Sequence, residues 1–137
     1  MLLKRFNLIN KERIKPFNKV IKVDSDKSLS IRSLLFGSIS QDISKIKNIL
    51  ESEDVFSTIN CLKKLGVKIN REKNGFYNVY GRGLGSLFAK KNAQLDFGNS
   101  GTLARLLIGI LTSTPNLEIK VKGDKSLNKR SMKKLIL

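Results

Sequence analysis

The sequence predicts an α/β fold that is built from a repeated unit of strands and helices. Short strand-like runs alternate with helical patterns, and glycine-containing turns separate them. The same order of strand, turn and helix occurs first near residues 18–38 and again near 94–111. The chain is therefore expected to hold one complete unit and part of a second.

Length and composition restrict the class of protein. At 137 residues, 40% of them hydrophobic, the chain can form one domain with a core or part of a larger protein. No apolar run reaches the roughly 18 residues of a membrane span, and residues 1–6 do not resemble a secretory signal. With Cys61 as the single cysteine and no histidine, neither an internal disulfide nor a metal site is expected. We expect a cytoplasmic protein without a cofactor or a membrane partner.

The formal net charge of +16 indicates a partner that is negatively charged. Nucleic acid, an acidic membrane surface and small anionic substrates all fit that charge. Nucleic-acid-binding proteins usually gather their cations beside aromatic residues. Here the lysines are spread along the chain and only 7% of residues are aromatic, which favours diffuse surface charge over a dedicated nucleic-acid surface.

The first unit follows a basic leader, which we expect to be flexible over residues 1–14. A strand is expected within residues 15–23. Ser28 is a candidate N-cap for a helix over about residues 28–38. Residues 43–49 alternate imperfectly between apolar and polar side chains and are interpreted as a short strand.

A second helix has clearer limits. Ser52 is a candidate N-cap, and Glu53 and Asp54 place negative charge in the first turn, where the helix dipole favours it. Gly66 is well placed to end this helix. Apolar residues recur at helical spacing between these limits: Val55, Ile59, Leu62 and Leu65.

A hairpin and the second unit complete the pattern. Asn74-Gly75 is a turn signal between strands expected at residues 67–71 and 76–80. After a loop the order begins again, with expected strands at 94–97 and 117–122, a helix at 103–111 and another helix from Asn128 onward.

Cations recur where strands lead into helices. In the run 26–32, Lys27 and Arg32 flank a helix start, and helix N-termini favour anions. The turn 98–102, with Arg105 beyond it, and the run 123–130 repeat this arrangement. Three such junctions predict a site for a ligand with several negative charges. The alternative at each junction is a capped or tight structural turn with solvated charges.

Four motifs in order resemble one known family, that of 5-enolpyruvylshikimate-3-phosphate (EPSP) synthase, which is 3-phosphoshikimate 1-carboxyvinyltransferase. The resemblance covers about residues 18–137. The motifs are Asp26-Lys27-Ser28-Leu29-Ser30-Ile31-Arg32, Leu50–Asp54 followed by Thr58–Val67, Leu95–Thr102 with Arg105, and Gly123–Arg130.

The resemblance implies roles for individual residues. Lys27 matches a lysine that contacts phosphoenolpyruvate and the shikimate phosphate, where it stabilises charge and acts in catalysis. Ser28 and Arg32 match shikimate 3-phosphate contacts. Gly101 matches the glycine whose backbone approaches phosphoenolpyruvate, and Arg130 matches an arginine that holds its phosphate. Supporting binding roles are expected for Asn99 and Arg105.

The resemblance also implies a fold, and it implies which part of the protein supplies the acid–base groups. The family's fold is a pair of domains built from repeated units of helices packed on four-stranded mixed sheets. Residues 24–137 would then be a partial domain, and the strand at 15–23 would belong with the missing half. The reaction transfers the enolpyruvyl group of phosphoenolpyruvate to the 5-hydroxyl of shikimate 3-phosphate. Its acid–base carboxylates come from the absent part, so the chain is expected to be inactive alone.

The chain departs from the family pattern at several positions. The Pro-Gly that usually precedes the lysine is Asp24-Ser25, the histidine or asparagine before the arginine is Ile31, and the last proline is Ser131. Three alternatives therefore remain open at this point. They are a relative of UDP-N-acetylglucosamine enolpyruvyl transferase, a degenerate remnant that binds nothing, and a basic nucleic-acid-binding module.

Overall fold

The computed structural model describes residues 24–131. The predicted leader over 1–14 and strand within 15–23 lie outside these residues. The elements, in chain order, are α1 (Lys27–Ile39), β1 (Ile43–Ile46), α2 (Glu53–Lys64), β2 (Lys68–Arg71), β3 (Tyr77–Tyr80), β4 (Gln94–Asp96), α3 (Gly101–Leu111), β5 (Lys120–Lys122) and α4 (Lys125–Asn128).

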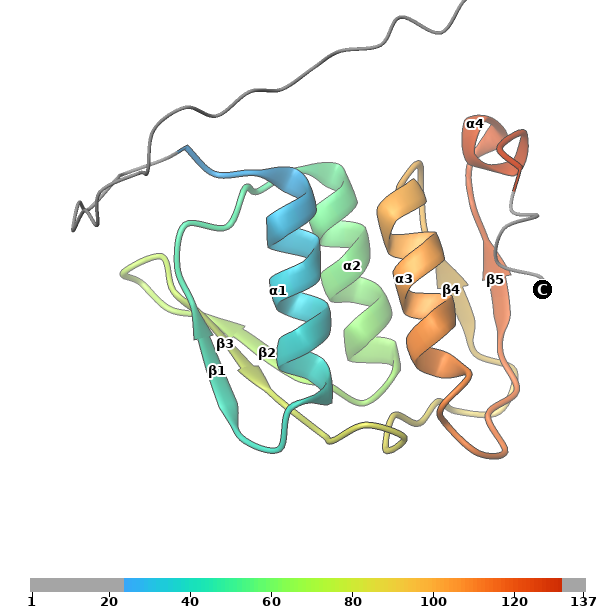
Figure 1. Ribbon diagram of the computed structural model, residues 1–137, viewed down its shortest axis with the longest axis horizontal. Coiled ribbons are helices and arrows are strands. Elements are labelled where there is room, and N and C mark those ends of the chain that lie inside the picture. The colour runs from blue at the N-terminus through green and yellow to red at the C-terminus, as the bar shows by residue number, and fades with distance from the viewer. Residues whose placement is uncertain (1–23, 132–137) are drawn as a thin grey trace, which may run out of the picture.

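Helices and two small sheets form the α/β arrangement that the sequence predicts. The antiparallel sheet β1-β3-β2 packs against α1 and α2, and the parallel pair β4-β5 is joined by the crossover helix α3 (Figure 1). The α/β class is confirmed. Within the described residues, however, the sheets have three and two strands instead of the expected four.

Three element limits differ by three residues from the sequence predictions, for local reasons, and the other limits agree within two residues. The strand expected over 43–49 ends at Ile46, and Asn48 has a φ of +60°, which strand residues do not adopt. The strand expected over 117–122 begins only at Lys120, because β4 offers just three residues for pairing. The last helix begins at Lys125 and ends at Asn128, since the Asp124 carboxylate accepts the Leu127 N–H and fixes the helix start before Asn128.

The core lies where the three longer helices meet. The apolar stripe predicted for α2 is buried in full, and Gly66, with a φ of +83°, follows the end of that helix. The stripe of α3 is buried only in part, because Leu106 is 38% exposed while Leu103 and Leu107 have no exposed surface. Further fully buried side chains hold the helices together, among them Ile31, Leu34, Leu62 and Leu95.

The cap of α1 is Asp26 and not Ser28. The Asp26 backbone is extended and its carboxylate oxygen accepts the Leu29 N–H at 2.7 Å. Ser28 already lies inside the first helical turn, so its hydroxyl cannot take the cap position. Both residue types are good N-caps, and the helix begins one residue before the predicted start.

Helices α1, α2 and α3 all begin at the same end of the molecule (Figure 1). β1 carries the chain back to that end before α2, and β4 carries it back before α3, so the three helices run in the same direction. The partial positive charges of three helix N-termini are therefore directed to one end. No helix within residues 24–131 is long and apolar enough to cross a membrane.

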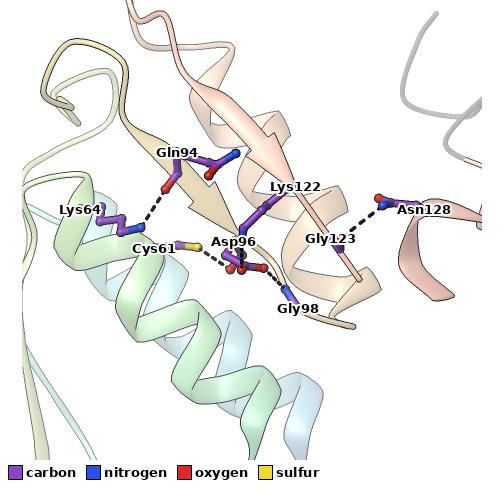
Figure 2. Close-up of polar contacts among 8 residues, drawn as sticks. All are labelled: Cys61, Lys64, Gln94, Asp96, Gly98, Lys122, Gly123 and Asn128. Atoms are coloured by element: carbon purple, nitrogen blue, oxygen red, sulfur yellow. Dashed lines mark hydrogen bonds and ion pairs between the residues drawn. The ribbon is translucent and has the colours of Figure 1, made fainter. Parts of the chain in front are cut away.

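The turn between β4 and α3 is organised by Asp96 (Figure 2). One of its carboxylate oxygens lies 2.9 Å from Lys122 Nζ, and the other accepts the Gly98 N–H at 3.0 Å. The Lys122 ammonium, followed by the Gly98 N–H, lowers the pKa of the Asp96 carboxyl. The buried Cys61 thiol donates to the Asp96 carbonyl at 3.3 Å, and burial raises its pKa to about 11. Asp96 thus ties the turn to β5.

Substitution of Asp26 by alanine tests the cap assignment. Loss of the carboxylate leaves an N–H of the first turn without its partner, so we expect the free energy of unfolding to fall by about 1 kcal/mol. Ser28→Ala should change it by less than about 0.5 kcal/mol. Urea denaturation followed by circular dichroism measures both, and equal losses would contradict the assignment.

Substitution of Asp96 by asparagine tests the ion pair at the turn. Because the pKa of Asp96 is lowered in the folded state, its stabilising effect is present above the unfolded value of about 3.9 and is lost as the pH falls through the folded value. The melting temperature of Asp96→Asn should therefore be below wild type at about pH 7, and the gap should narrow at about pH 3. Asp42→Asn, at an exposed carboxylate without an ion pair in the described region, is the control. An unchanged gap for Asp96→Asn would refute the assignment.

Candidate anion-binding site

The first cation at the common end is Lys27, the first residue of α1. Its side chain is half exposed, and its ammonium lies 3.0 Å from a carboxylate oxygen of Asp54 in the first turn of α2. The sequence places Asp54 at a helix start, but its spacing gives no sign of this contact. The structure shows that Asp54 joins the beginnings of α1 and α2.

Ser28 and Arg32 lie on the same side of α1, because they are four residues apart. Arg32 is exposed and lines a groove between α1 and α3, together with Phe36 and Leu106. Its guanidinium forms no ion pair with a carboxylate in residues 24–131. The second turn of α1 therefore offers a cation that is available to a ligand.

A second group of predicted residues gathers at the beginning of α3. Ser100 is the cap of this helix, with its hydroxyl accepting the Leu103 N–H at 3.3 Å. The side chain of the preceding residue, Asn99, contacts an arginine: its Oδ1 accepts a hydrogen bond from Arg130 Nη2 at 2.6 Å. This bond joins the turn after β4 to the residues that follow α4.

Gly101 lies beneath two guanidinium groups. A Cβ placed on Gly101 would stand 3.0 Å from Arg130 Nη1 and 3.4 Å from Arg105 Nη1. The two positive charges repel one another, and an anion between or beside them would offset that repulsion. No carboxylate in the described part of the chain pairs with either arginine. Together with the start of α3, they form an arrangement that suits a phosphate or a carboxylate.

Four carboxylates around this end of the molecule are already engaged, whereas Asp24 and Glu53 form no ion pair within residues 24–131. Asp26 and Asp124 cap helices, Asp54 pairs with Lys27, and Asp96 pairs with Lys122. A general base must be free to take a proton from its substrate. The four engaged carboxylates are not free for that role, whereas the unpaired cations and the helix starts suit binding and charge stabilisation. The expected absence of the acid–base pair stays a prediction.

The predicted site residues thus form two groups. Asn99, Gly101, Arg105 and Arg130 are in direct proximity, whereas Lys27, Ser28 and Arg32 share the first turns of α1. Among the departures from the family pattern, Ile31 has no exposed surface and fills the core, so its side chain does not face the site. Asp24 and Ser131 are both exposed.

Comparison with known proteins agrees with these motifs. The family model for EPSP synthase (3-phosphoshikimate 1-carboxyvinyltransferase) matches residues 11–137. A 3-phosphoshikimate 1-carboxyvinyltransferase from Syntrophomonas wolfei is 44% identical over 123 residues, which are 90% of this chain and 28% of that protein. One from Bacillus cytotoxicus is 43% identical over 93% of this chain and 30% of its own length.

A solved structure shows the same relationship. An EPSP synthase from Acinetobacter baumannii superposes with a TM-score of 0.73 at 39% identity, and the match covers 82% of this chain and 25% of that one. The chain spans less than a third of the length of the curated relatives it matches. Because the family model matches most of its residues, the chain belongs to the EPSP synthase family.

Proposed function

We propose that this chain is the N-terminal part of an EPSP synthase and binds the phosphate groups of shikimate 3-phosphate and phosphoenolpyruvate. The observation that carries the proposal is the approach of the Arg105 and Arg130 guanidinium groups over Gly101 without a carboxylate partner. An anion bound at this site would offset the repulsion between the two charges.

Each residue has a role in this proposal that its position supports. Arg130, held by Asn99, grips the phosphate of phosphoenolpyruvate, and Gly101 lets that ligand approach the start of α3. Ser28 and Arg32 contact shikimate 3-phosphate from one side of α1. Lys27, the first residue of α1, stabilises the charge that develops in the reaction. Arg105 supports Arg130.

The rest of the reaction belongs to sequence that this chain does not span. The relatives are several times longer than the region they share with it. We propose that the acid–base carboxylates and the other side of the binding site come from that remaining sequence. We further propose a reducing cytoplasmic setting, in keeping with the free thiol of Cys61.

A thermal-shift titration with shikimate 3-phosphate tests the proposal. A ligand that binds only the folded chain must raise its melting temperature, by an amount that grows with concentration. The double variant Lys27→Ala, Arg32→Ala should show no shift, while Lys45→Ala, Lys68→Ala removes equal charge from the sheet and should respond like wild type. No shift in the folded wild type would overturn the proposal, as would equal shifts in all three proteins.

Substitution of Gly101 by alanine should separate binding from stability. The added methyl group would press on the Arg130 guanidinium, so we expect affinity for phosphoenolpyruvate to fall by about tenfold. Gly109→Ala is the matched control in the same helix, because nothing lies within 4 Å of its added Cβ. That control should raise the free energy of unfolding by about 0.5–1 kcal/mol and leave affinity unchanged. Equal affinities for the two variants, measured by calorimetry, would contradict the role of Gly101.

A further inference from the structure

We propose that Asp54 is a positioning residue, which holds the Lys27 ammonium in place for an anionic ligand at the start of α1. The inference rests on the proposed function of Lys27 and extends it to a second residue. The contact is direct, with 3.0 Å between Lys27 Nζ and Asp54 Oδ2.

The two side chains differ in length and in exposure, and this difference indicates which of them holds the other in place. Lysine carries its charge on a flexible four-carbon stem, and the Lys27 side chain is 50% exposed. Asp54 has a short side chain that is only 18% exposed, and it lies in the first turn of α2 beside the fully buried Val55. The Thr58 hydroxyl, also buried, donates to the Asp54 carbonyl at 2.8 Å. The carboxylate therefore acts as a fixed anchor for the mobile ammonium.

A role in stability alone explains the contact less well. An ion pair with a half-exposed partner contributes little to the stability of the fold, because water screens it. A negative charge at the start of α2 does favour the helix dipole, but Glu53 supplies the same charge from the adjacent position. The feature that distinguishes Asp54 from Glu53 is its contact with Lys27.

The other acidic group at the start of α1 does not replace Asp54. The carboxylate of Asp26 is directed to the Leu29 N–H as the helix cap. In residues 24–131, Asp54 is the carboxylate that pairs with Lys27. Without it, the lysine side chain would be free to adopt many rotamers, and binding would have to order it.

An effect of charge alone and a positioning role predict opposite changes in anion affinity for the variant Asp54→Asn. Coulomb's law alone predicts tighter binding of an anion, because a negative charge near the ligand is removed. A positioning role predicts weaker binding, since ordering a long side chain costs free energy on association. We expect affinity for shikimate 3-phosphate to fall about threefold to tenfold in Asp54→Asn.

Glu53→Gln is the matched control, because it removes the same charge from the same helical turn without touching Lys27. It should leave affinity unchanged or raise it slightly, and its melting temperature reports the effect of the helix dipole alone. Calorimetric titration of wild type and both variants decides between the explanations. Unchanged or tighter binding in Asp54→Asn would overturn the positioning role.

A measurement without ligand separates this inference from the proposed function. NMR relaxation of the Lys27 side chain, with isotope-labelled lysine, should show an ordered terminal group in wild type and in Glu53→Gln. In Asp54→Asn the same group should become as mobile as an exposed lysine such as Lys73. If wild type shows an ordered Lys27 but does not bind the ligand, only the proposed function is refuted. If Lys27 is mobile in wild type, the role of Asp54 is refuted.

Discussion

The packing of α1 against α2 and α3 is the constraint on which the rest of the structure depends. Ile31, Leu34, Leu62, Leu103 and Leu107 have no exposed surface, and together they hold three helices that run in the same direction. That common direction brings three N-termini to one end of the molecule. Every cation assigned to the site belongs to one of these ends or is tied to it, as Arg130 is through Asn99. The core therefore determines where an anion can bind.

Sequence patterns predicted those parts of the fold whose signals are local. The limits of α2 were predicted because acidic first-turn residues, an apolar stripe and Gly66 all agree. Ser52 does stand at the predicted N-cap position, but its hydroxyl makes no capping hydrogen bond. Where signals compete, prediction was less successful. Asp26 and Ser28 are both good caps two residues apart, and only the structure shows that the chain is already helical at Ser28, so that Asp26 is the cap. The short strands β1 and β5 depend on the partners available to them, which local sequence does not contain.

In the candidate site, too, local motifs were predictive, whereas contacts between distant residues were not. Motifs indicated seven residues, but spacing could not show that Asn99 binds Arg130, because the two are far apart in the chain. It also assigned Asp54 only to the helix dipole, since a contact between two helices has no local pattern. Gly101 was indicated by its motif, and the structure adds the reason for the absence of a side chain, namely the two guanidinium groups above it.

The departures from the family pattern differ in consequence because burial differs. Ile31 replaces a polar family residue, yet it is fully buried and adds apolar surface to the core, where a polar group would need a hydrogen-bond partner. Asp24 instead is exposed and lies two residues before Asp26, the cap of α1, where the family pattern begins its Pro-Gly turn. Its negative charge precedes a helix whose first residue is Lys27, so it moderates the attraction of this end for anions. Arg32, Arg105 and Arg130 form no ion pair within residues 24–131, and they outnumber Asp24 and Glu53, the carboxylates at this end that also form none there. The end of the molecule therefore still favours an anionic ligand.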